Sequence, residues 1–222
     1  MKQAIDASRS TASSGLVDKM LWRQRRALFD AFAEFRKEAA DGTVLNMYMH
    51  PASPFTDSDY LGAWSTPDQA VHITPHEVRL SSGTRTRTTP VRLPYADDRF
   101  DWVFCNEVIE HAGRPQRQMA LIAELYRVAR KGVFLTTPNR HHPIEFNSGR
   151  LLMHLLPAPW WRRLLRWSGK GEWAEEGMLN LLDAPALYRF ADLLPGVPEH
   201  DVGHKRLFGI KAHFFLMIRK RA

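Results

Sequence analysis

The sequence predicts an α/β protein with a mostly parallel sheet, an antiparallel last strand and a helical insertion. The first observation is a buried strand, an amphipathic helix and a second buried strand that follow one another between residues 99 and 138. A strand–helix–strand unit of this kind requires parallel strands joined by a right-handed crossover. The second observation is the end of the chain, where residues 203–220 have the pattern of two strands, the last almost continuously apolar. A final antiparallel pair on an otherwise parallel sheet fits an α/β domain.

Each element follows from the spacing of its apolar residues. Between residues 16 and 39, apolar side chains recur at helical intervals, and Ser13 or Ser14 can cap this helix. The turn signal Asp41-Gly42 precedes a short strand over 43–45. In total the patterns predict helices over 16–39, 60–64, 117–130 and 157–167, and strands over 43–45, 69–74, 99–105, 131–138 and twice within 203–220, with a weaker strand after the polar turn 81–90.

Length and composition indicate one domain. The 222 residues are 44% hydrophobic and 25% charged, which is ordinary for a globular protein. We expect a frayed polar tail over 1–15 and a single domain over 16–222, with 139–195 as a helical insertion that forms a lid over the substrate. No apolar run reaches the roughly 18–20 residues that span a bilayer, and the first residues have no signal-peptide core. These features predict a cytoplasmic protein.

Cysteine and histidine usage argues against a disulfide or a metal site. The only cysteine, Cys105, cannot form an intrachain disulfide, and it ends an apolar strand where a small buried side chain is common. No histidine pair has the HxH or HExxH spacing of a metal site. We therefore predict no metal at the histidines considered, which are His50, His72, His76, His141, His142 and His154.

The net charge of +7 suits nucleic acid, anionic lipid or phosphorylated substrates as partners. The basic residues are spread along the chain without the aromatic-basic pattern of an RNA-binding sheet, so nucleic acid is not indicated. One segment, 157–167, is a basic amphipathic helix with three tryptophans. Two interpretations remain open: a lid with its apolar face turned to the active site, or contact with an anionic membrane surface that makes the protein peripheral to the membrane.

Three short motifs recur in order: Leu93-Pro94-Tyr95, Phe100-Asp101 and Glu110-His111. With the segments that follow them, they resemble the class I S-adenosylmethionine-dependent methyltransferases, in particular the type 11-like subgroup. The resemblance covers roughly residues 40–140. It implies a Rossmann-like class I methyltransferase fold, S-adenosyl-L-methionine as the cofactor, and methyl transfer to an O or N atom of an unidentified acceptor, either a small molecule or an envelope-related one.

The resemblance also implies cofactor contacts at the ends of successive strands. Residues 46–49 would lie near the methionine part of the cofactor, and Thr74 would lie near the ribose. Residues around 89–93 would flank the adenine, while Cys105 and Asn106 would border the other side. The full set of expected cofactor residues is Asn46, Met47, Tyr48, Met49, Thr74, Thr89, Arg92, Leu93, Cys105 and Asn106.

The sequence departs from the family pattern at three of these places. The first loop contains no glycine until Gly62, and Tyr48 stands where a glycine is expected. Thr74 follows the second strand with its nearest acid at Glu77, and Thr89 replaces an acid that would face the adenine. Each lost charged hydrogen bond costs roughly 1.5–3 kcal/mol. The alternative hypothesis is therefore a catalytically inactive methyltransferase-like binding or scaffold protein, which Tyr48 filling the methionine pocket would favour.

For an active enzyme, the protein would align the acceptor, exclude water and supply a base. By position the candidate bases are His111 and His141. Asn139 and Glu145, just after the last parallel strand of the resemblance, could orient the acceptor. For Glu110 and His111 the competing interpretation is that they brace a helix.

Overall fold

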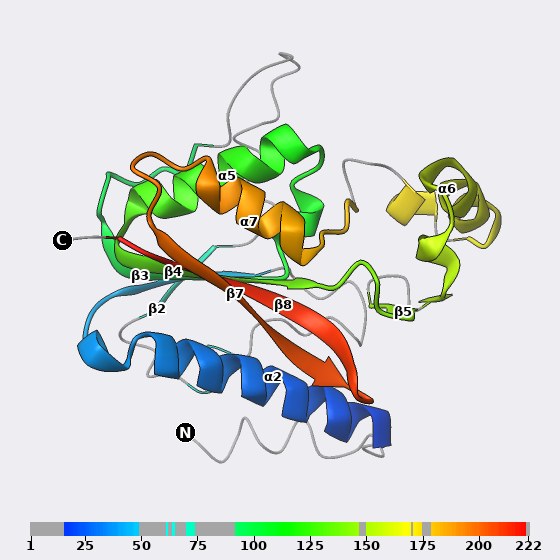
Figure 1. The fold of residues 1–222 in the computed structure, drawn as a ribbon, viewed down its shortest axis with the longest axis horizontal. Coiled ribbons are helices and arrows are strands. Elements are labelled where there is room, and N and C mark those ends of the chain that lie inside the picture. Colours follow the sequence, from blue (N-terminus) through cyan, green and yellow to red (C-terminus); the bar gives the residue numbers. More distant parts are fainter. Residues whose placement is uncertain are drawn as a thin grey trace.

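The computed structural model describes residues 16–48, 61, 64, 70–73, 92–146, 150–169, 171–174 and 179–220. A six-stranded sheet forms its centre, with one long helix on one face and two helices on the other (Figure 1). In spatial order the strands are β2 (Ala70–Ile73), β1 (Val44–Tyr48), β3 (Phe100–Asn106), β4 (Ala129–Pro138), β8 (Ile210–Arg219) and β7 (Glu199–Leu207).

Strand direction confirms the predicted fold class. Strand β1 pairs in parallel with β2 and β3, and β3 pairs in parallel with β4. Strand β8 is antiparallel to both of its neighbours, β4 and β7. The result is a Rossmann-like, mostly parallel sheet with an antiparallel last strand.

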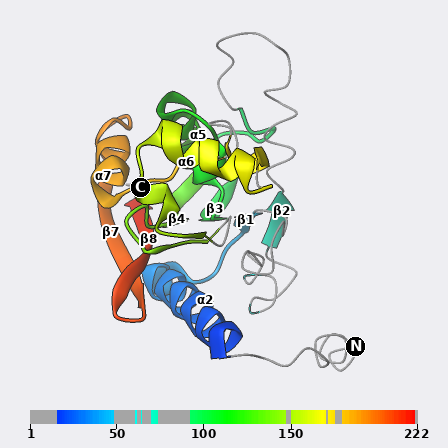
Figure 2. The ribbon, with the colours of Figure 1, turned by 90° about the vertical axis from the view of Figure 1, so that its right-hand side faces the viewer.

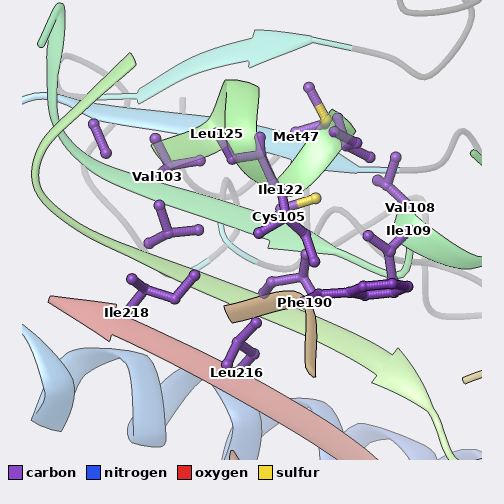
Figure 3. Packing of buried hydrophobic residues seen from close by; sticks show 14 of the residues in the cluster. Met47, Val103, Cys105, Val108, Ile109, Ile122, Leu125, Phe190, Leu216 and Ile218 are labelled. Atoms are coloured by element: carbon purple, nitrogen blue, oxygen red, sulfur yellow. The ribbon is translucent and has the colours of Figure 1, made fainter. Parts of the chain in front are cut away.

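Two apolar layers hold the sheet because side chains alternate along each strand. Met47, Val103 and Cys105 point to the face covered by α5 (Pro115–Val128) and α7 (Ala184–Asp192), where Figure 3 shows them packed with residues of both helices. The opposite face is covered by α2 (Leu16–Phe35). There Phe32 packs on the rings of Phe104 and Phe134.

Local sequence sets the ends of the two helices on the first face. Pro115 occupies the first turn of α5, where its missing N–H costs nothing. Helix α7 begins after Asp183, whose carboxylate accepts a hydrogen bond from the Ala186 amide at 2.9 Å. These caps orient both helices along the sheet.

The segment after β4 contains only short elements before α7. They are β5 (Ile144–Glu145), β6 (Arg150–Leu151), the 3-10 helix Met153–Leu155, α6 (Ala158–Trp167) and the 3-10 helix Gly171–Ala174. Figure 1 shows α6 set apart from α2, α5 and α7, and Figure 2 looks onto α6 from that side. Helix α7 differs, because it packs on the sheet within the main core.

Several element boundaries differ from the sequence predictions. Strand β1 runs to Tyr48, beyond the predicted end at residue 45, because it continues to pair with β3. Helix α2 ends at Phe35, and a separate 3-10 helix (Lys37–Ala39) completes the predicted helix 16–39. The tail 1–15 and most of the predicted helix 60–64 lie outside the described residues. The weaker strand expected after 81–90 is wrong, because residues 92–99 form bends and turns and the next strand begins at Phe100.

Candidate functional site

The carboxyl ends of β1, β3 and β4 meet at one edge of the sheet. Tyr48 lies opposite Asn106, and Asn106 lies opposite Thr136. Open parallel sheets bind ligands beyond this edge. The candidate site therefore consists of the residues that these strands place at this edge.

The chain turns sharply where β3 ends. Glu107 has a backbone φ of 53°, in the left-handed region that few non-glycine residues adopt. Its amide donates to the carbonyl oxygen of Thr136 at 3.1 Å and to the hydroxyl of the same residue at 3.2 Å. The Thr136 hydroxyl also donates to Oδ1 of Asn106. These bonds fix the backbone that places the Glu107 side chain at the edge.

Glu107 pairs with a buried histidine from the last strand. Oε1 of Glu107 lies 2.8 Å from Nε2 of His213, and the side-chain amide of Gln24 on α2 contacts Nδ1 of the same ring. Burial would raise the pKa of Glu107, but the hydrogen bond and charge of His213 outweigh it and lower that pKa. Glu107 is therefore ionised at neutral pH.

The pKa of Glu110, in the 3-10 helix Ile109–His111, is shifted in the opposite direction. Glu110 is fully buried, and burial together with repulsion from Glu107 raises its pKa well above the usual value. Oε2 accepts a hydrogen bond from the Thr137 hydroxyl at 3.0 Å. Oε1 has no hydrogen-bond partner among the described residues and lies 4.0 Å from Nε2 of His111. The edge thus holds two carboxyl groups whose pKa values are shifted in opposite directions.

Residues 179–182, which lead into α7, pack against this edge. The Asn180 amide donates to the carbonyl oxygen of Glu110 at 2.7 Å, and its side chain donates to the carbonyl oxygen of Gly113 at 3.0 Å. Leu182 forms a β-bridge with Asn139. The segment 179–182 therefore holds the 3-10 helix of Glu110 in place.

The structure separates the expected cofactor residues at β1 and β3 into two groups. Met47 and Cys105 are fully buried in the apolar core between the sheet and α5, so their side chains do not reach the edge (Figure 3). Asn46 and Asn106 are buried on the α2 face. Tyr48 is half-buried and, by strand alternation, shares the face of Asn46.

The segment around Leu93, which the resemblance places beside the adenine, is hydrogen-bonded to α5. The Leu93 amide donates to Glu124 at 2.8 Å, and its carbonyl oxygen accepts from Arg127 at 3.2 Å. Arg127 also donates to the carbonyl oxygen of Tyr95 at 2.9 Å. Leu93 is buried and Arg92 is exposed. Met49, Thr74 and Thr89, also expected at the cofactor, lie outside the described residues.

The predicted catalytic and acceptor-orienting residues do not form one group. His111 is buried beside Glu110, whereas the His141 side chain is 65% exposed, with Nε2 3.9 Å from Asp183. The Asn139 side chain donates to the carbonyl oxygen of Lys211 at 2.7 Å and accepts from the His141 amide at 2.9 Å, which commits it to bracing the turn after β4. Glu145 is buried in β5.

The sequence assigned no role to Glu107, His213 or Gln24. The available signal was His213 itself, the only polar residue in the apolar run 212–218. Its partner lies more than a hundred residues away in the chain, so only the sheet order reveals the pair.

A separate groove of about 630 Å³ lies between α2 and strands β7 and β8. None of the edge residues lines it, and its walls carry charges of both signs, so we assign the function to the edge. The lining residues are Asp30, Ala31, Glu34, Phe35, Lys37, Glu38, Glu199, His200, Asp201, Lys205, Phe215, Met217 and Arg219.

The fold is that of a Rossmann-like α/β protein, and its carboxyl edge is where such sheets bind ligands. Comparison with known families agrees: residues 70–137 match the family described as "Methyltransferase domain". The resemblance seen in the sequence is therefore confirmed for the segment from β2 to the end of β4.

Two curated relatives are similar over 101 residues, or 43% of this chain. An uncharacterized methyltransferase of Mycolicibacterium paratuberculosis (strain ATCC BAA-968 / K-10) is 36% identical, and one of Mycobacterium avium (strain 104) is 35% identical. The match covers 38% of the length of each relative. Among solved structures, a putative methyltransferase from Bacillus halodurans superposes with a TM-score of 0.44 at 12% identity, covering 86% of this chain and 98% of that one.

Proposed function

We propose that this protein transfers a methyl group from S-adenosyl-L-methionine to an O or N atom of an acceptor at the carboxyl edge of β1, β3 and β4. The observation that carries the proposal is the methyltransferase-domain match over 70–137, which contains β2, β3, α5 and nearly all of β4. Two of the three strands whose carboxyl ends form the edge, β3 and β4, lie in this segment. The relatives reported above do not support the alternative of an inactive binding protein.

The negative charge at the described part of the edge complements the cationic groups of this cofactor. S-adenosylmethionine carries a sulfonium and an ammonium group, both cationic, and supplies an electrophilic methyl group when bound. Glu107 presents an ionised carboxylate at the edge, and its side chain is 15% exposed. We assign Tyr48 and Asn106 to cofactor binding, and we assign the Met47 and Cys105 side chains to the core alone.

The side chains at the edge have separate roles in the proposed reaction. Glu107 accepts a hydrogen bond from the acceptor O–H or N–H and orients it, while His213 and Gln24 hold that carboxylate in place. Because His213 has both ring nitrogens engaged, it acts as a positioning residue. Glu110, kept protonated by burial, adds no second negative charge beside Glu107 and allows the edge to stay dry.

Calorimetric titration with S-adenosylhomocysteine tests the proposal. We expect micromolar affinity for the wild-type protein and roughly tenfold weaker binding for Glu107→Gln, because the variant lacks the carboxylate that accepts a charged hydrogen bond from the ligand's ammonium group, a bond that contributes roughly 1.5–3 kcal/mol. Glu34→Gln, at an exposed position on α2, is the matched control and should bind like the wild type. Absence of binding at millimolar ligand by a folded protein would overturn the proposal.

A further inference from the structure

Helix α6 has an apolar side that the protein covers only in part. Trp161 and Leu165, one turn apart, are buried in a small cluster with Ala174 and Leu179. Trp160, by contrast, is 70% exposed. Helical periodicity brings residues 160, 164 and 167 onto one stripe beside the buried one. Trp167 on that stripe is 86% exposed, so two indole rings of one stripe face solvent.

More exposed apolar side chains precede the helix. The 3-10 helix Met153–Leu155 packs against α6, and this segment extends with α6 beyond the β5 end of the molecule (Figure 1). We call the exposed residues of this region the α6 patch; they are Leu151, Leu152, Leu155, Leu156, Trp160 and Trp167, with exposed fractions of 62%, 51%, 49%, 44%, 70% and 86%. Contiguous exposed apolar surface on a folded protein usually marks an interaction site.

The third side of α6 is basic. Arg162, Arg163 and Arg166 lie between the buried stripe and the exposed stripe on the far side of the helix. Residues 150–170 contain five basic side chains and no Asp or Glu. Charge of one sign beside tryptophan and leucine favours an anionic, partly apolar partner.

We propose that α6 docks on the surface of an anionic lipid bilayer. The helix would lie in the plane of the interface with Trp160 and Trp167 at the headgroup boundary and the arginines against lipid phosphates. Tryptophan suits this boundary because its ring is apolar and its N–H stays hydrated. Among the described residues no helix is long and apolar enough to cross a membrane, so the contact is peripheral. This inference does not depend on methyl transfer.

Co-sedimentation of the full chain with phosphatidylglycerol vesicles tests the proposal. We expect binding in low salt, weaker binding in high salt and little binding to phosphatidylcholine vesicles. Trp160→Ala/Trp167→Ala should bind at least about tenfold more weakly, because two large apolar groups no longer enter the interface. Arg163→Gln should bind about fivefold more weakly, the value of one basic residue near an anionic surface.

Matched controls separate the patch from general stickiness. Leu193→Ala/Phe208→Ala removes two exposed apolar side chains elsewhere, which are 69% and 57% exposed, and should bind vesicles like the wild type. Arg117→Gln, on exposed α5 surface, controls for net charge. Equal vesicle binding by the wild type and the tryptophan double variant would overturn the proposal. So would failure to bind anionic vesicles together with dimerisation that Trp160→Ala/Trp167→Ala abolishes, since the occupant would then be a second copy of the chain.

Discussion

At the scale of single residues, Glu107 and Glu110 illustrate how surroundings set chemistry. The two carboxyl groups are three positions apart, yet His213 lowers the pKa of Glu107 while burial raises that of Glu110. Each charge disfavours the other, because two ionised carboxylates in a buried site repel. The repulsion between them adds to the burial that raises the pKa of Glu110.

Replacing each glutamate by glutamine should change stability in opposite directions. The pKa of Glu110 is raised in the folded protein. The stability that this group contributes is therefore complete below its unfolded pKa of about 4.5 and is lost as the pH rises toward its folded pKa. Glu110→Gln should therefore unfold at higher urea than the wild type at pH 8, by about 1 kcal/mol, and the difference should shrink by pH 5. Glu107→Gln, which breaks the pair with His213, should unfold at lower urea at pH 8. Destabilisation by Glu110→Gln at pH 8 would contradict this assignment.

Asp101 belongs to the motif Phe100-Asp101, one of the three on which the resemblance to methyltransferases rests. It lies at the amino-terminal end of β3, opposite to the candidate site. Burial would raise its pKa, yet hydrogen bonds from Arg130, the Thr43 amide and Lys131 lower it to about 2. Its carboxylate thus ties the beginnings of β1, β3 and β4 together. The motif residue is structural, which its spacing in the sequence does not reveal.

We expect Asp101→Asn to destabilise the protein by roughly 1.5–3 kcal/mol at neutral pH, the value of a charged hydrogen bond. A lowered folded pKa gives stability that is present above the unfolded value of about 3.8 and is lost as pH falls toward 2. Urea unfolding between pH 6 and pH 2.5 should therefore show wild type and variant converging at the acid end. A gap that stays constant down to pH 2.5 would refute the ion-pair role.

At the scale of elements, α2 is fixed to the sheet by aromatic side chains. Phe32 is 1% exposed and lies 4.8 Å from the ring of Phe104 and 5.5 Å from that of Phe134, measured between ring centroids. Periodicity predicted this helix and its apolar face. It could not predict the end of β1, because continued pairing with β3, a tertiary contact, carries that strand to Tyr48.

Phe32→Ala should lower the free energy of unfolding by about 3–5 kcal/mol, since it leaves a cavity between α2 and the sheet. The matched variant Phe29→Ala, at a half-buried position one turn earlier, should cost clearly less. Both values follow from urea denaturation followed by circular dichroism. Equal losses for the two variants would mean that α2 is not anchored through Phe32.

At the scale of the whole molecule, the sequence predicted the fold well and the site only in part. The parallel β3–α5–β4 unit and the edge at its carboxyl end follow from the strand–helix–strand pattern and from the motifs around Leu93 and Glu110. The sequence indicated a buried Cys105, but it could not show that the Met47 side chain turns into the core. Nor could it pair Glu107 with His213, because that contact depends on β8 lying beside β4.

The most direct test of the account is a crystal structure of the protein grown with S-adenosylhomocysteine. If methyl transfer takes place at this edge, the ligand lies beyond the ends of β1 and β3, against Tyr48 and Asn106. The Glu107 carboxylate then faces the position of the transferred methyl group. A ligand bound elsewhere on the molecule, or a Tyr48 side chain filling the space at the end of β1 with no ligand bound at millimolar concentration, would contradict it.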